Sequence, residues 1–221
     1  MIETSSVDTI LVRKLELDLE GDLEMRRNLT AFLAVLGLLA FVTMPPVSSA
    51  SGLEIGSTVE SFSLPDTDGK MQTLDSLKGK KGTVIVWLSA QCPVVKAYKD
   101  RINEIAAAYK DKGITFIGIN SNATEDLTWV KSNMAEFGYQ FPMLIDKGNV
   151  LADKWGATVT PEVYFLDNKN VLKYHGAIDN DRSGRNVQEQ FLKTAFDSAL
   201  AGKPIEKAKT AAFGCTIKKA E

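Results

Sequence analysis

The chain has 221 residues, of which 44% are hydrophobic and 24% charged, so it is long enough to bury one good core. Subtracting the four basic and seven acidic side chains of residues 1–50 from the totals leaves 22 basic and 21 acidic side chains in residues 51–221. This near-zero balance leaves no electrostatic footprint for nucleic acid or for an anionic membrane surface, so neither is a predicted partner.

Residues 1–50 have the pattern of an export signal. Met25-Arg26-Arg27 precedes a 14-residue apolar stretch, Leu29–Val42, and small residues precede the predicted cleavage site after about Ala50. An uncleaved anchor is the alternative, but a membrane span needs about 20 apolar residues. The acidic residues 1–24 suggest that translation starts at Met25. We expect a periplasmic or secreted protein that meets the membrane only transiently, during export.

The segment after the signal begins with a predicted hairpin. Two short strand candidates, Ser61–Leu64 and Met71–Leu74, flank an Asp-Gly pair at Asp68-Gly69, which is a strong turn signal. The next strand candidate, Val84–Leu88, is apolar and rich in β-branched residues. Such a run predicts a strand that is buried on both faces of a sheet.

A helix predicted after this strand begins at the first cysteine. Its apolar residues recur at spacings of three and four: Val95, Tyr98, Ile102, Ile105, Ala106 and Tyr109. Pro93 suits the first helical position, so Cys92 falls at the N-cap or in the turn before it. The positive end of the helix dipole favours a thiolate over a thiol, which makes Cys92 a candidate reactive cysteine.

The middle of the chain continues the alternation of strands and helices. Ile114–Ile119 is a second buried strand, parallel to the first through a right-handed crossover. Asn122–Thr124 is expected to cap a helix that runs to Phe137. Phe141–Asp146 is predicted to be extended, and Val150–Trp155 to form one or two helical turns.

The last third of the chain predicts a hairpin, a helix and a tail. Glu162–Leu166 is a strand candidate that follows Thr160-Pro161, and Val171–His175 returns beside it as an edge strand. Asn186–Ala201 is the predicted last helix. The tail, residues 205–221, has no clear periodicity and contains the second cysteine, Cys215.

This order resembles the peroxiredoxin-like redoxins of the alkyl hydroperoxide reductase/thiol-specific antioxidant group, within the thioredoxin superfamily. The resemblance covers about residues 56–218 and rests on FSLPDTDGK, WLSAQCP, VTPEVYFLD, YHGAID and the late Gly-Cys-x-Ile of Gly214–Ile217. It implies an α/β, thioredoxin-like fold: a central mixed sheet flanked by helices, with an N-terminal β-hairpin extension. The domain is expected to span 51–204. It also implies that Pro161 is cis and that Thr160 and Pro161 present backbone groups to a bound peptide or thiol beside Cys92.

The sequence departs from the patterns of this superfamily at the reactive cysteine. Thioredoxins carry Cys-x-x-Cys, whereas Val95 stands here at the position of the second cysteine, which is also where peroxiredoxins place their peroxidatic cysteine. Ser89 could replace the threonine of the peroxiredoxin motif, but Ile85 stands in place of its proline. The peroxide-binding arginine also has no candidate beside Thr160-Pro161. The resemblance therefore predicts the fold more specifically than the reaction.

A disulfide exchange needs a second thiol to resolve the mixed disulfide, and Cys215 is the only internal candidate. In an exported protein the two cysteines are expected to form or exchange a disulfide. Three readings stay open: a reversible Cys92–Cys215 disulfide, a permanent staple that pins the tail, and a free tail thiol. The reversible disulfide is the hypothesis that we carry forward.

The predicted function is a thiol-disulfide oxidoreductase that acts on protein or small-molecule thiols and disulfides, without a cofactor. Cys92 and Cys215 are the candidate catalytic residues, and the candidate substrate-binding residues are Thr160, Pro161, Ser89 and Trp87. The first alternative is a thiol-dependent peroxidase, for which peroxide is the substrate. The second is a non-enzymatic protein, either with a structural disulfide or with copper on Cys92, Cys215 and His175. The sequence lacks the paired nearby cysteines of copper carriers, so no metal site is predicted.

Overall fold

The central sheet of the structure is built around its most apolar strand, β3 (Gly82–Trp87). In the computed structural model, which describes residues 52–220, β3 is buried along its whole length. It pairs in parallel with β4 (Ile114–Asn120) and antiparallel with β7 (Glu162–Asp167). The edges are β5 (Met143–Ile145) and β8 (Leu172–Gly176), so the strand order is β5-β4-β3-β7-β8. The predicted mixed sheet is confirmed, whereas the predicted export signal lies outside the described residues.

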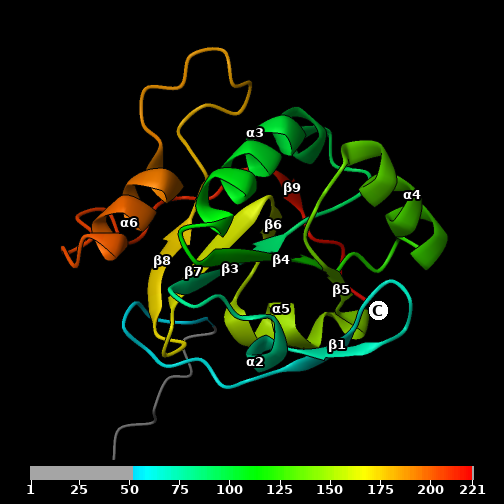
Figure 1. Cartoon of the computed structure of the whole chain (residues 1–221). Coiled ribbons are helices and arrows are strands. Elements are labelled where there is room, and N and C mark those ends of the chain that lie inside the picture. Colours follow the sequence, from blue (N-terminus) through cyan, green and yellow to red (C-terminus); the bar gives the residue numbers. More distant parts are fainter. Residues whose placement is uncertain (1–51, 221) are drawn as a thin grey trace, which may run out of the picture. The chain divides into compact units, whose positions relative to one another are not determined.

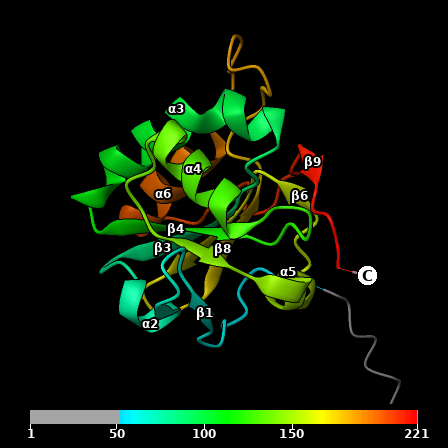
Figure 2. The same ribbon diagram turned by 90° about the vertical axis from the view of Figure 1, so that its right-hand side faces the viewer.

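Helices cover both faces of this sheet, as Figures 1 and 2 show. One face carries three helices: α3 (Pro93–Lys110), α4 (Leu127–Phe137) and α6 (Phe191–Leu200). The other carries α2 (Leu74–Leu77), α5 (Val150–Trp155) and the β1–β2 hairpin. Alternate side chains of β3 therefore enter two separate cores. Within the described residues, no helix combines the length and the apolarity that crossing a bilayer requires.

The N-terminal hairpin forms where the sequence predicts it. β1 (Ser63–Pro65) pairs antiparallel with β2 (Met71–Thr73), and the Asp66 carboxylate accepts hydrogen bonds from the backbone N–H groups of Asp68 and Lys70. The turn is thus held by a side chain as well as by its glycine. The hairpin extends the fold at the N-terminus, as expected from the resemblance.

Two predicted helix starts are wrong, and in both cases side-chain amides explain the difference. The N-cap of α4 is Asp126, because its carboxylate accepts from Trp129 N, while the Asn122 side chain accepts instead from Lys218 N of the tail. α6 begins at Phe191 rather than at Asn186, because the Asn180 side-chain oxygen accepts from Gln188 N and Glu189 N and holds that segment as a loop. The expected end of this helix is confirmed: α4 ends at Phe137, and Gly138, with a φ of 69°, is its C-cap.

The tail after α6 is ordered although its sequence has no periodicity. It first runs beside the edge strand β8, where His175 N donates to Ala208 O at 2.9 Å and Thr210 N donates to His175 O at 3.0 Å. It then forms β9 (Cys215–Thr216), which pairs antiparallel with β6 (Val159–Thr160). Ile217 follows and is only 2% exposed, in the core on the α2–α5 side of the sheet. The tail is therefore anchored on both sides of Cys215.

We expect Gly214→Ala to destabilise the attachment of the tail. A Cβ at position 214 would overlap the carbonyl oxygen of Thr160, so β6 and the tail would have to move apart. Overpacking of this kind lowers the free energy of unfolding by about 1–3 kcal/mol. Urea unfolding of the full chain measures the effect, with Ala211→Ser at an exposed tail position as the control. Equal stability of the two variants would contradict this packing.

Candidate active site

The strand β3 delivers the first cysteine to the N-terminus of α3. Cys92 is the N-cap of this 18-residue helix and Pro93 is its first residue, as the sequence predicts. The Cys92 side chain makes no capping hydrogen bond, and because Pro93 has no N–H, the N–H groups of Val94 and Val95 are the first that could stabilise a thiolate. The residue is 2% exposed and belongs to the core under α3.

Cys92 and Cys215, which are 123 residues apart, form a disulfide with a Cα–Cα distance of 5.8 Å. The pairing of β6 with β9 places Cys215 directly opposite Thr160. The Thr160–Pro161 peptide bond is cis, and the Cys92 Sγ lies 3.3 Å from the carbonyl oxygen of Thr160. The structure thus brings together four of the predicted site residues: the two cysteines, Thr160 and Pro161.

A buried glutamate holds the loop that carries the cis-proline. Glu162 is 3% exposed, and one of its carboxylate oxygens accepts from Thr158 N at 2.9 Å and from Val159 N at 3.2 Å. Its other oxygen lies 2.6 Å from His175 Nε2. Sequence reasoning missed this residue. A carboxylate directly after Thr-Pro in an otherwise apolar strand is the signal that could have found it.

A second glutamate holds the loop that leads to Cys92. The Glu125 carboxylate accepts hydrogen bonds from the Ser89 hydroxyl at 2.5 Å, from Ala90 N at 2.9 Å and from Gln91 N at 3.0 Å. It also accepts from the Asn120 side chain at 2.6 Å. These bonds fix the three residues before Cys92. No periodicity or spacing in the sequence marks Glu125, because it lies 33 residues beyond the cysteine.

The role expected for Ser89 changes accordingly. Ser89 is 4% exposed and its hydroxyl donates to Glu125, so it is a structural part of the loop before Cys92. The Ser89 hydroxyl, which the resemblance predicts to contact a substrate, is thus already bonded to Glu125. Ser89 is placed close to the site in sequence and space, but its side chain is already engaged.

Trp87 does not line the disulfide, which corrects the sequence expectation. Its side chain has no exposed surface and packs on Trp155 and Tyr164, in the core on the other face of the sheet from Cys92. The indole N–H donates to the Ser121 hydroxyl at 3.1 Å. The reason is strand geometry: odd-numbered residues of β3 point away from α3, and only even-numbered ones point toward it.

The residues proposed for copper are not gathered in the structure. His175 bonds Glu162 through Nε2 and stacks on Tyr164 with ring centroids 4.0 Å apart, while both cysteines are in the disulfide. Between residues 52 and 220, no group of three His, Cys, Asp or Glu side chains has the arrangement of a metal site. His175 instead contacts Glu162, the carboxylate that holds the cis-proline loop.

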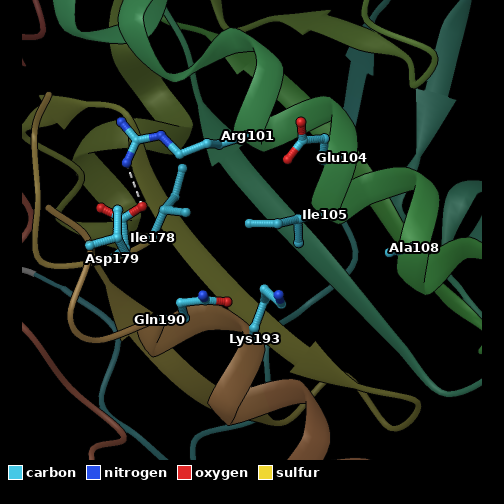
Figure 3. A pocket seen from close by; sticks show the side chains of 9 residues that line it. Arg101, Glu104, Ile105, Ala108, Ile178, Asp179, Gln190 and Lys193 are labelled. Carbon is cyan, nitrogen blue, oxygen red and sulfur yellow. Dashed lines mark hydrogen bonds and ion pairs between the residues drawn. The ribbon is translucent and has the colours of Figure 1, made fainter. Parts of the chain in front are cut away.

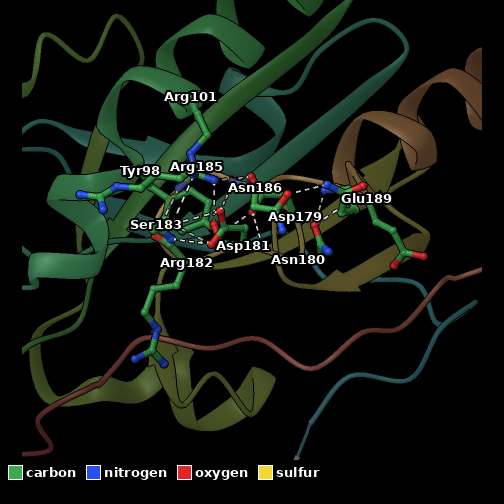
Figure 4. A network of polar contacts seen from close by, with 11 residues as sticks. Tyr98, Arg101, Asp179, Asn180, Asp181, Arg182, Ser183, Arg185, Asn186 and Glu189 are labelled. Carbon is green, nitrogen blue, oxygen red and sulfur yellow. Dashed lines mark hydrogen bonds and ion pairs between the residues drawn. The ribbon is translucent and has the colours of Figure 1, made fainter.

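A polar network lies beside α3, two turns beyond Cys92 (Figure 4). The Asp179 carboxylate accepts from the Tyr98 hydroxyl and from the Arg101 guanidinium, each at 2.6 Å. Burial raises the pKa of Tyr98 well above its ordinary value. Backbone N–H groups of Asn186 and Ser183, which donate to its carboxylate, lower the pKa of Asp181 to about 2. The network fixes the loop between β8 and α6.

The same ion pair borders a hollow of about 320 Å³ between α3 and α6, which Figure 3 shows. Arg101 and Asp179 lie at one side of it, and Gln190 and Lys193 of the α6 region lie at another. The Arg101 charge is compensated by Asp179, so this hollow offers no free guanidinium to an anion. We assign the chemistry to the disulfide instead.

Comparison with known proteins supports the same fold. A hypothetical protein of Sinorhizobium meliloti 1021 is 30% identical, with a TM-score of 0.70 over 76% of this chain and 96% of its own. An uncharacterized conserved protein of Geobacillus kaustophilus is also 30% identical, with a TM-score of 0.71 over 81% of this chain and 98% of its own. The thioredoxin-like fold expected from the sequence is confirmed.

Several relatives of known name are called thiol-disulfide oxidoreductases. The thiol-disulfide oxidoreductase ResA of Bacillus anthracis is 29% identical over 115 residues, which are 52% of this chain. The match covers 65% of that relative, less than two thirds of its length. Residues 54–190, more than half of the chain, match the Redoxin family. The resemblance stated from the sequence is thus confirmed, and the chain belongs to the Redoxin family.

Proposed function

We propose that the protein is a thiol-disulfide oxidoreductase whose reactive unit is the Cys92–Cys215 pair. The observation that carries the proposal is the position of this disulfide, with one sulfur at the N-terminus of α3 and both cysteines against the cis Thr160–Pro161 bond. Relatives named as thiol-disulfide oxidoreductases agree with it. Protein and small-molecule thiols and disulfides are the proposed substrates.

In the proposed reaction, the Cys92 thiolate of the reduced protein attacks a substrate disulfide. A mixed disulfide forms on Cys92 and one substrate sulfur leaves as a thiolate. Cys215 then attacks the Cys92 sulfur, forms the internal disulfide and releases the second substrate thiolate. Because Cys92 is 2% exposed when β9 is in place, the two-residue pairing of β9 with β6 has to open before a protein disulfide reaches Cys92.

The helix and the two glutamates have separate roles in this proposal. The dipole and the free N–H groups of α3 stabilise the Cys92 thiolate both as attacking group and as leaving group. Glu125 holds the loop before Cys92, and Glu162 holds the loop before Pro161. Neither glutamate makes a hydrogen bond to a sulfur. Both are positioning residues.

We also propose that the protein acts outside the cytoplasm, after removal of a signal peptide near Ala50. The support is the basic start, the apolar stretch and the small residues of 25–50. An oxidising compartment would maintain the disulfide between uses. N-terminal sequencing of protein recovered from the periplasm or medium tests this, and an exported form that keeps residues 25–50 would contradict cleavage.

We expect the wild-type chain to accelerate the reduction of insulin by dithiothreitol, and Cys92→Ser to abolish the acceleration. Cys215→Ser should also slow turnover, but it should accumulate a mixed disulfide on Cys92, because the resolving thiol is gone. Turbidity and mass spectrometry under denaturing, non-reducing conditions measure the two effects. Wild-type rates from both variants would contradict the proposal. So would consumption of hydrogen peroxide that outpaces disulfide exchange, which would favour the peroxidase alternative.

We expect Glu125→Gln to slow exchange while the fold is retained. A glutamine offers one acceptor oxygen, and its NH₂ group would face donors that the carboxylate now satisfies. Of the donors to Glu125, those of Ser89 and Asn120 are buried. An unsatisfied buried donor costs about 1–3 kcal/mol, so the free energy of unfolding should fall by that order. The matched control is Glu136→Gln on α4, an exposed carboxylate 3.7 Å from Lys96. Equal exchange rates for the two variants would contradict a positioning role for Glu125.

A further inference from the structure

The two cysteines of the disulfide differ in how exposed they are, although both contact the core under α3. Cys92 is 2% exposed and is packed within the core under α3. Cys215 is half-buried, and its neighbour Thr216 is exposed. Thiol-disulfide exchange depends on which sulfur is attacked and on access to it. Access alone therefore favours attack on the Cys215 sulfur of the oxidised protein.

The two sulfurs also differ as leaving groups. Attack on Cys215 expels Cys92, whose negative charge then lies at the N-terminus of the 18-residue α3 with no competing side-chain cap. Attack on Cys92 would expel Cys215, which lies in the two-residue β9. A sulfur with a lower thiol pKa leaves faster, and a helix N-terminus lowers that pKa. Access and leaving group thus point to the same sulfur.

The tail keeps Cys215 in place while this happens. Ahead of it, the Thr210 hydroxyl accepts from Ala177 N at 3.0 Å. Behind it, Ile217 N donates to Thr158 O at 2.9 Å and Lys218 N donates to the Asn122 side chain at 2.8 Å. These contacts are made by residues other than the two cysteines. An attacking thiol therefore meets Cys215 on an anchored strand rather than on a free chain end.

We propose that the thiol which reduces this protein attacks Cys215, so that the electron donor and the substrate use different sulfurs. The inference rests on the proposed function, in which the substrate forms its mixed disulfide with Cys92. A donor thiolate attacks the Cys215 sulfur, a donor–Cys215 disulfide forms, and the Cys92–Cys215 bond breaks with its electron pair on Cys92. A second donor thiolate attacks the donor sulfur of that mixed disulfide. It releases the Cys215 thiolate, and two donor thiols have become one disulfide.

The test is to locate the first donor adduct on the oxidised wild-type full chain. The protein is mixed with reduced glutathione, quenched at early times with N-ethylmaleimide, and mapped by peptide mass spectrometry without reductant. We expect glutathione on Cys215 and N-ethylmaleimide on Cys92, in severalfold excess over the reverse labelling when extrapolated to zero time. Because no substitution is made, loss of folding does not complicate the result.

The outcomes separate this inference from the function on which it rests. Glutathione found first on Cys92 would overturn the inference and leave an exchanging disulfide. A disulfide that neither glutathione nor dithiothreitol opens in the folded protein would overturn both. A comparison of thiol sizes adds a second readout: 2-mercaptoethanol and glutathione should give the same site of attack. A site that moves from Cys92 to Cys215 as the thiol grows would contradict a preference built into the protein.

Discussion

The pairing of β6 with β9 is the contact on which the proposed chemistry depends. It places Cys215 opposite Thr160, next to the cis-proline and within bonding distance of a cysteine that is 123 residues earlier in the chain. Without this short pairing, Cys92 would be a single cysteine at a helix N-terminus with no resolving partner. In this chain a strand of the tail therefore supplies the second sulfur, which a Cys-x-x-Cys motif would supply from the same helix.

Two hydrogen-bonded carboxylates, the buried Glu162 and the partly buried Glu125, hold the two loops of this site in place. Glu162 receives backbone N–H groups from the loop before Pro161, and Glu125 receives those of the loop before Cys92. Each charge is satisfied by several donors, which is the condition under which a buried carboxylate is tolerated. The tail adds its own anchor at Ile217. The disulfide thus joins the loop before Cys92, which Glu125 holds, to the tail, which Ile217 anchors in the core.

The order of strands and helices could be read from the sequence because each element has a local pattern. The apolar run of β3, the helical spacing after Cys92 and the Asp-Gly turn depend only on neighbours in the chain. The partners of the site could not be read in this way. Glu125 and Glu162 act on backbone groups of loops, and β9 is two residues long, so no periodicity marks them. Trp87 was misplaced because proximity along a strand does not reveal which face a side chain takes.

The disulfide also has a structural consequence, because closing a loop of this length stabilises a fold by about 4–5 kcal/mol in the chain-entropy model. A permanent staple and an exchanging disulfide therefore share this geometry and differ in how readily they are reduced. Equilibration of the protein in thiol buffers measures the reduction potential of Cys92–Cys215, the property that separates the two. An exchanging disulfide should have a potential above about −300 mV, whereas a value well below it would indicate a permanent staple and rule out the exchange mechanism.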